Sequence, residues 1–312
     1  MLPRRLALVS TLILIALVLA ACQPVAATLV PAGTGSAPAL RVLAAETFLA
    51  DIAQNVAGTR LKVEALMPRG VDPHAYEPTP RDVVKIAVCD LLLTNGAGFE
   101  GWLNKLLTTA ATKAVVVEVS AGIAPRTPSV NEAVDEAVDP HFWLDPTNVI
   151  TYVANIRDAL IAADPAGSAI YIANAAAYTL RLQELDSWVT EQVAAIPPER
   201  RLLVTNHETF GYFADRYGFT IIGTIIPSVS TGASPSAQQL AHLVDLIVAT
   251  KVIAIFLETG TNPQLADQLA RETGIKVVSG LYTHSITEPG GQAPTYIDMI
   301  KYDVQAIVNA LK

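Results

Sequence analysis

Four histidines stand in widely separated loops of this chain, in a pattern that predicts a metal site. They are His74 in Val-Asp-Pro-His, His141 in Val-Asp-Pro-His-Phe, His207 in Val-Thr-Asn-His and His284 in Leu-Tyr-Thr-His. Each lies near the carboxyl end of an apolar segment or in a Pro-rich turn, where α/β folds gather ligand groups. Because neutral imidazole is the commonest metal ligand in proteins, the four together indicate a metal ion held between two lobes.

The fifth histidine has a different setting. His242 falls in a predicted helix, 235–249, but outside the apolar stripe that Leu240, Leu243 and Ile247 define. We expect His242 to be a surface residue.

The N-terminus has the pattern of a secretory signal. An Arg-Arg pair precedes an apolar run, 6–19, that is too short to span a membrane, and Leu-Ala-Ala-Cys ending at Cys22 follows at once. This motif resembles a bacterial lipobox, so residues 1–22 are predicted to be a lipoprotein signal peptide with Cys22 as the lipidated first residue of the mature chain. An ordinary signal peptide with an incidental cysteine is the alternative. We expect an extracytoplasmic protein, lipid-anchored to the cell membrane on its periplasmic or cell-surface side.

Composition predicts a globular body behind a flexible tether. Residues 23–39 carry no charge and are rich in Ala, Pro, Gly and Ser. About 270 residues follow, enough for two domains, and 51% of the chain is hydrophobic. A net charge of −8 without a Lys/Arg cluster argues against nucleic-acid binding. Once Cys22 is lipidated only Cys89 remains, so no internal disulfide is expected, and its apolar context predicts a buried, inert thiol.

Apolar β-rich segments alternate with amphipathic ones, which predicts an α/β fold with two lobes built on parallel-type sheets. The predicted strands are 40–44, 61–66, 91–94, 114–119, 201–205, 219–223, 252–257 and 275–279. The predicted helices are 46–57, 80–88, 99–109, 208–217, 235–249, 263–273 and 293–311.

One long helix is predicted to join the lobes. Residues 164–196 are Ala-rich and contain neither Gly nor Pro beyond Gly167. Their apolar stripe comprises Tyr171, Ala175, Tyr178, Leu182, Leu185, Val189, Val193 and Ile196. A helix of roughly 30 residues is about 45 Å long and would connect an N-terminal lobe, 40–163, to a C-terminal lobe, 197–312.

Several helix starts are marked by a capping residue followed by proline, whose fixed φ and missing N–H suit the first helical turn. These pairs are Thr79-Pro80, Asp145-Pro146, Asp164-Pro165, Ser234-Pro235 and Asn262-Pro263.

Most catalytic motifs are absent. His207-Glu208 begins like His-Glu-x-x-His, but Gly211 stands where the second histidine is needed. Neither the Gly-x-Ser-x-Gly of serine hydrolases nor a Walker loop occurs. The turn from Gly96 to Gly101 matches Gly-x-Gly-x-x-Gly, but Glu100 would put a negative charge beside a pyrophosphate. We interpret this segment as a glycine-rich turn between a strand and a helix.

A family resemblance rests on motifs in these same loops. They are Leu-Met-Pro-Arg-Gly-Val-Asp-Pro-His74, Asp-Leu-Leu-Leu-Thr-Asn-Gly-Ala-Gly-Phe-Glu-Gly-Trp at 90–102, Asp-Pro-His141-Phe-Trp-Leu-Asp-Pro and Thr-Asn-His207-Glu-Thr-Phe-Gly-Tyr-Phe. From about residue 40 to the C-terminus the chain resembles the solute-binding lipoproteins of bacterial zinc and manganese ABC importers. The resemblance implies two α/β lobes linked by one long helix, with the metal in the cleft between them.

The resemblance also implies the ligands and the partners. The family's first three ligand positions match His74, His141 and His207; the fourth, usually an aspartate, matches His284. A partner permease, its ATPase subunit and a monomeric receptor are expected. Relatives have also been described as surface adhesins, which nothing here supports beyond the tether.

The replacement of aspartate by His284 favours zinc as the transported ion. Four histidines form a neutral, borderline-soft, readily tetrahedral set, whereas manganese prefers more oxygen ligands. A manganese or iron receptor on the same scaffold is the alternative, because the acidic loop 131–139 lacks the histidine-rich insertion of many zinc-specific relatives. If His284 does not bind the metal, water or Glu258 would complete a three-histidine site.

Carboxylates that could orient the histidines stand nearby in the sequence. The candidates are Asp72, Asp139, Asp145, Glu208 and Glu258, and Asp145 could equally be a helix N-cap. A zinc hydrolase with Glu208 or Glu258 as general base is a distant alternative. We therefore expect a receptor and not an enzyme.

Overall fold

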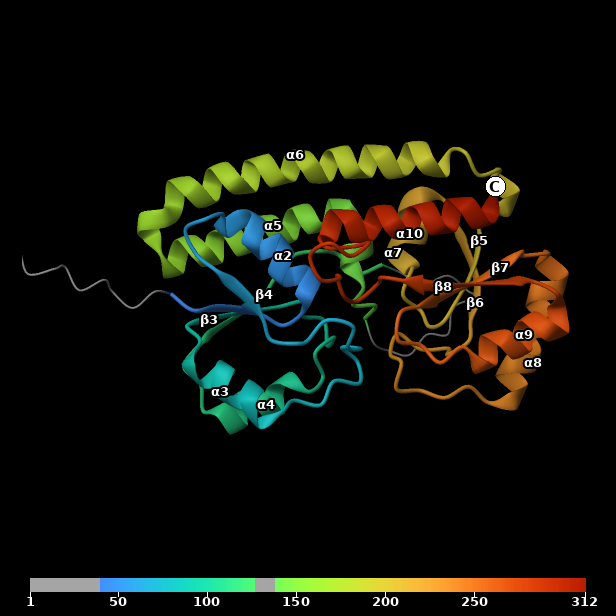
Figure 1. The fold of residues 1–312 in the computed structure, drawn as a ribbon, viewed down its shortest axis with the longest axis horizontal. Coiled ribbons are helices and arrows are strands. Elements are labelled where there is room, and N and C mark those ends of the chain that lie inside the picture. The colour runs from blue at the N-terminus through green and yellow to red at the C-terminus, as the bar shows by residue number, and fades with distance from the viewer. Residues whose placement is uncertain (1–39, 127–137) are drawn as a thin grey trace, which may run out of the picture. The chain divides into compact units, whose positions relative to one another are not determined.

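Two four-stranded parallel sheets form the framework of the computed structural model, which describes residues 40–126 and 138–312 (Figure 1). The first sheet has the order β2-β1-β3-β4, with β1 Val42–Ala44, β2 Val63–Ala65, β3 Leu91–Thr94 and β4 Val115–Glu118. The second has the order β6-β5-β7-β8, with β5 Leu202–Thr205, β6 Thr220–Thr224, β7 Ala254–Glu258 and β8 Lys276–Leu281. Every pair is parallel, so the predicted two-lobed α/β fold is confirmed.

Helices cover both faces of each sheet. They are α2 Thr47–Ala57, α3 Pro80–Val88, α4 Leu103–Ala110, α5 Pro146–Ala163, α6 Ser168–Val193, α7 Gly211–Tyr217, α8 Ala237–Thr250, α9 Gln264–Thr273 and α10 Tyr296–Leu311. Short 3-10 turns occur at Phe142–Leu144, Pro165–Gly167 and Pro198–Arg200. Helices α3 and α4 pack on the outer face of the first sheet, and α8 and α9 on that of the second. The remaining helices enclose one apolar core that both sheets share.

Helix α6 links the lobes and runs along both of them (Figure 1). Its buried residues are Tyr171, Ala175, Tyr178, Leu182, Leu185, Val189 and Val193, which are the members of the predicted stripe that lie within the helix. The spacing of three and four residues keeps these side chains on one face, toward α2, α5 and α10. The predicted backbone helix is confirmed, although it is shorter than the range 164–196.

Two of the five capping pairs, Thr79-Pro80 and Asp145-Pro146, mark the start of an α-helix as predicted. Asp164-Pro165 instead begins a 3-10 turn, with α6 starting three residues after Pro165, and α9 begins one residue after Pro263. Thr79 forms a capping box with Asp82, and the Asp145 carboxylate accepts a hydrogen bond from the Thr147 N–H. Ser234-Pro235 was the wrong pair, because α8 begins two residues later. There Ser236 and Gln239 cap each other reciprocally, which satisfies two N–H groups and outweighs the proline signal.

Asp164, at the turn between α5 and α6, should make stability depend on pH. Its carboxylate accepts hydrogen bonds from Arg60 at 2.5 and 2.8 Å and from Tyr171 at 2.5 Å. These contacts, with Arg60 the largest cause, lower the pKa of Asp164 to about 2. The folded-state pKa therefore lies below the unfolded value, so the stabilisation is present above about pH 4 and is lost as the pH falls toward 2.

The variant Asp164→Asn tests this. The difference in free energy of unfolding between the original chain and the variant should be constant from pH 5 to 7 and should shrink below about pH 4. Urea titrations at a series of pH values measure it. A difference that does not change with pH would contradict the assignment.

No helix in the described part of the chain combines the length and apolar character needed to cross a bilayer. The predicted signal peptide, tether and Cys22 lie outside the described residues, and the lobe limits 40–163 and 197–312 stay predictions.

Candidate metal centre

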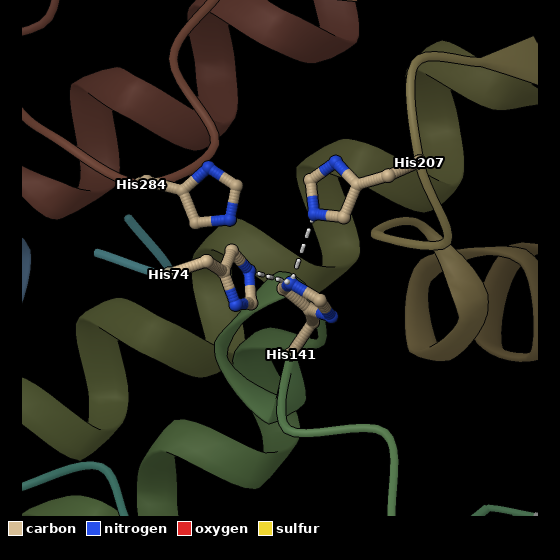
Figure 2. Close-up of side chains that lie close together, drawn as sticks. All are labelled: His74, His141, His207 and His284. Carbon is tan, nitrogen blue, oxygen red and sulfur yellow. Dashed lines mark hydrogen bonds between the residues drawn. The ribbon is translucent and has the colours of Figure 1, made fainter. Parts of the chain in front are cut away.

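The four predicted histidines come together at the carboxyl ends of the strands (Figure 2). His74 lies in the loop after β2, His141 directly precedes a 3-10 turn, and His207 and His284 follow β5 and β8. One ring nitrogen from each lies within 4.8 Å of the others. Two loops from each lobe thus bring four imidazoles to one point. Such convergence is expected where the parallel strands of two sheets end.

The cluster is largely buried, and two of its histidines, His74 and His141, favour the neutral form. His141 and His207 are fully inaccessible, whereas His74 is half-buried. Burial, followed by the neighbouring histidines, lowers the pKa of His74 to about 2 and holds the pKa of His141 well below its usual range. Both imidazoles are therefore unprotonated near neutral pH, the form that binds a metal.

Carboxylates fix which nitrogen of two rings carries the proton. Asp139 Oδ1 lies 2.9 Å from His141 Nδ1, and Glu258 Oε1 lies 2.9 Å from His207 Nδ1. A carboxylate only accepts hydrogen bonds, so the proton of each neutral ring stays on Nδ1 and Nε2 carries a lone pair. These two Nε2 atoms nevertheless face each other at 3.3 Å. Two lone pairs at that distance repel unless a cation lies beside them.

Glu258 joins two of the histidines. It is the last residue of β7, and its second oxygen, Oε2, lies 3.0 Å from His284 Nδ1. Thr209 and Thr283 each donate to one of its oxygens, at 3.0 and 2.8 Å. The paired histidines hold the pKa of Glu258 well below its usual range despite complete burial, which alone would raise it. Glu258 therefore lies behind the cluster as a charged carboxylate that orients both rings.

His284 has the one ligand nitrogen in the described residues that is buried without a partner. Its Nε2 makes no hydrogen bond, although Nδ1 is held by Glu258. The first lobe also holds this loop, because Trp143 Nε1 donates to the Thr283 carbonyl at 2.7 Å and Gly70 N donates to Ser285 Oγ at 2.8 Å. An orphaned buried nitrogen beside three other imidazoles is the environment that a metal ion would satisfy.

Arg126 and Gly211 support the cluster, and no sequence motif pointed to either role. The Arg126 guanidinium lies 3.6 Å from Asp139 and 2.9 Å from Asp215. A Cβ at Gly211 would come within 2.6 Å of both Arg126 and Asp139. Gly211, which stands where the His-Glu-x-x-His motif needs a histidine, thus leaves room for Arg126 and Asp139, the pair that positions His141.

The other predicted carboxylates have different positions. Asp145 caps α5 and is not next to the histidines' nitrogens, which agrees with its alternative interpretation. Asp72 accepts from the backbone N–H of His74 at 2.9 Å and from Thr231 Oγ1 at 2.5 Å. Glu208 is buried, and its backbone N–H donates to the Ser228 carbonyl at 3.0 Å.

The glycine-rich turn folds around its own carboxylate. Glu100 accepts hydrogen bonds from the N–H groups of Asn95 and Gly96, at 2.5 and 3.2 Å. These are the donors that a phosphate would require, so the turn is closed by the chain itself. The next residue back, Phe99, packs edge-on against His74 at 4.9 Å between ring centroids and forms an apolar wall of the site.

Two residues that were predicted to take no part in metal binding lie outside the histidine cluster. His242 is exposed on α8, and Cys89 is buried with its thiol donating to the Ile86 carbonyl at 3.3 Å. Burial raises the pKa of Cys89 to about 11, so it stays an unreactive thiol at neutral pH.

Residues 42–310 match one sequence family, described as zinc-uptake complex component A, periplasmic. This chain belongs to that family. Membership makes it the extracytoplasmic substrate-binding component of a metal-uptake system, the general function that the sequence predicts. The match covers both lobes and the four histidine loops.

Three relatives differ in the metal that their names record. The manganese-binding lipoprotein MntA of Halalkalibacterium halodurans is 35% identical over 87% of this chain and 88% of its own length. The iron-binding protein YfeA of Yersinia pestis is also 35% identical, over 87% and 86%. The periplasmic zinc-binding protein TroA of Treponema pallidum has a similar structure, with a TM-score of 0.78, 28% identity and coverage of 88% and 99%. Family membership therefore leaves manganese, iron and zinc to be distinguished by the site itself.

Proposed function

We propose that this chain is the receptor of an ABC importer and that it binds Zn²⁺ through His74, His141, His207 and His284. The observation that carries the proposal is the pair of Nε2 atoms of His141 and His207, 3.3 Å apart, each with its ring proton held on the far side by a carboxylate. A cation between the two Nε2 atoms would stabilise this arrangement. A neutral four-nitrogen set matches the tetrahedral preference of zinc better than the oxygen preference of manganese.

The histidine site is already arranged to bind a cation before the cation arrives. His74 and His141 are neutral at neutral pH, so a cation need not displace protons from these two ligands. Glu258 supplies a buried negative charge that interacts with the cation through His207 and His284. Release requires the cleft to loosen or the ligands to be disturbed, which we assign to contact with the permease.

The cellular setting is part of the same proposal. Cys22 anchors the mature chain to the membrane by a lipid, residues 23–39 act as the tether, and the receptor works as a monomer with the permease and its ATPase subunit. The chain performs no chemistry on its cargo, because four protein ligands leave no open position for an activated water. A coordination number of four nitrogens from X-ray absorption supports the receptor; three nitrogens with a bound water would favour the zinc hydrolase.

Competition between metals tests the choice of zinc. Protein stripped with a chelator should bind one equivalent of metal and should prefer Zn²⁺ to Mn²⁺. Because the Irving–Williams order favours zinc in most sites, the informative quantity is the change caused by His284→Asp. We expect that variant to lower the ratio of zinc affinity to manganese affinity by about tenfold or more, since it adds an oxygen ligand and a negative charge.

The variant His284→Asn is the matched control, with the shape of aspartate and no charge. It should weaken both metals without moving the ratio toward manganese as far as His284→Asp does. Preference for Mn²⁺ or Fe²⁺ in the unmodified chain would overturn the zinc assignment and leave the receptor function intact.

A further inference from the structure

A cavity of about 180 Å³ adjoins the histidine cluster and is not part of the ligand set. Loop residues Gly70 to Asp72 line it from the first lobe, and Asn206, Thr261 and Asn262 line it from the second. The volume has room for several water molecules, and the polar lining offers them hydrogen-bond partners. This access cavity can therefore hold a solvated guest.

The access cavity reaches one of the four proposed ligands. His284 is one of its lining residues, and the side chain is 9% exposed with Nε2 buried and without a partner. Glu258 also lines the cavity, but each of its oxygens already faces one histidine and one threonine. The cavity is thus lined both by half-buried Asp72 and by a histidine whose Nε2 lacks a partner.

We propose that the access cavity is a binding site for a hydrated divalent cation on its way to the histidines. Asp72 attracts the ion, and the neutral side chains of Asn206, Thr261 and Asn262 hold it through its water ligands. His284 then replaces one of those waters. This inference rests on the proposed function as a metal receptor, and it adds a step before the ion reaches its final ligands.

Asp72 also has structural contacts, which the experiment must separate from its charge. Its Oδ1 accepts from the His74 N–H at 2.9 Å, and its Oδ2 accepts from Thr231 Oγ1 at 2.5 Å, across the two lobes. The variant Asp72→Asn keeps an acceptor for His74 and a polar group for Thr231 but removes the charge. The variant Thr231→Val removes the contact between the lobes but keeps the charge.

Rapid mixing of Zn²⁺ with the metal-free protein measures both rate constants. Trp143 reports binding by its fluorescence, because its ring centroid lies 5.3 Å from that of His141. At low ionic strength Asp72→Asn should lower the association rate constant about three- to tenfold and change the dissociation rate constant less than twofold. The difference should shrink in 0.5 M salt, where charges are screened.

Two control variants separate the effect of the Asp72 charge from other effects on the association rate. Asp245→Asn removes the same charge from an exposed position on α8 and should leave association unchanged. Thr231→Val should slow association less than Asp72→Asn does. An association rate unchanged in Asp72→Asn, or slowed equally in Thr231→Val, would overturn the access site. Failure of the unmodified chain to bind Zn²⁺ would instead contradict the proposed function.

Discussion

Replacing His207 by alanine should weaken zinc binding by about 100-fold or more. Structural zinc sites with four ligands have apparent binding free energies of about 10–16 kcal/mol, so each ligand contributes on the order of 2.5–4 kcal/mol. His207 is fully buried, and its removal leaves a space that water cannot fill with equal ligand geometry. His74→Ala should have a comparable effect, because its Nε2 also points to the centre of the cluster, 3.3 Å from His141 Nε2.

Isothermal titration of chelator-stripped protein, with a competing chelator for the tight complexes, measures these affinities. His242→Ala is the matched control, since it removes the same side chain from an exposed position on α8. It should bind zinc as the original chain does. Thermal unfolding of the metal-free variants checks that the fold survives. Affinity that is unchanged in both His74→Ala and His207→Ala would rule out this cluster as the metal site.

Replacing Glu258 by glutamine should weaken zinc binding by about 10- to 100-fold, although Glu258 lies behind the ligands. Its two oxygens lie 2.9 and 3.0 Å from the Nδ1 atoms of His207 and His284, and a carboxylate there favours the tautomer with the proton on Nδ1 and a free lone pair on Nε2. Glutamine has one carbonyl oxygen and one NH₂ group, so it can accept from only one ring. The other ring must accept at Nδ1, which moves its proton to Nε2 and blocks that ligand.

The distinguishing measurement for Glu258→Gln is the number of nitrogens around the bound metal. X-ray absorption of the zinc-loaded variant should give three histidine nitrogens where the original chain gives four. Glu199→Gln removes a charge of the same type from an exposed 3-10 turn and should change neither affinity nor coordination. Four nitrogens retained in Glu258→Gln, with full affinity, would show that the carboxylate does not set the ring protons.

The fold class, the long helix and the four candidate histidines could all be predicted from the amino-acid sequence. The hydrophobic periodicities of strands and helices depend only on neighbouring residues in the sequence. For this reason the bounds of β3 and α3 match the predicted ranges, and the predicted apolar stripe contains every buried residue of α6. Helix α8 was misplaced because a reciprocal cap at Ser236 competed with the nearby proline signal. The four histidines were separable from His242 because they alone stood in loops at strand ends.

The orientation of those histidines depends on contacts between segments that are distant in the sequence. Asp139 is close to His141 in sequence, but Glu258 reaches His207 and His284 across 51 and 26 positions, through the parallel order of β5, β7 and β8. The pairs Arg126 with Asp215 and Trp143 with Thr283 likewise join segments far apart in the chain. Ligand type is a property of single residues and can be read locally. Ring protonation, burial and the access cavity depend on non-local neighbours, which the packing of the two lobes alone brings together.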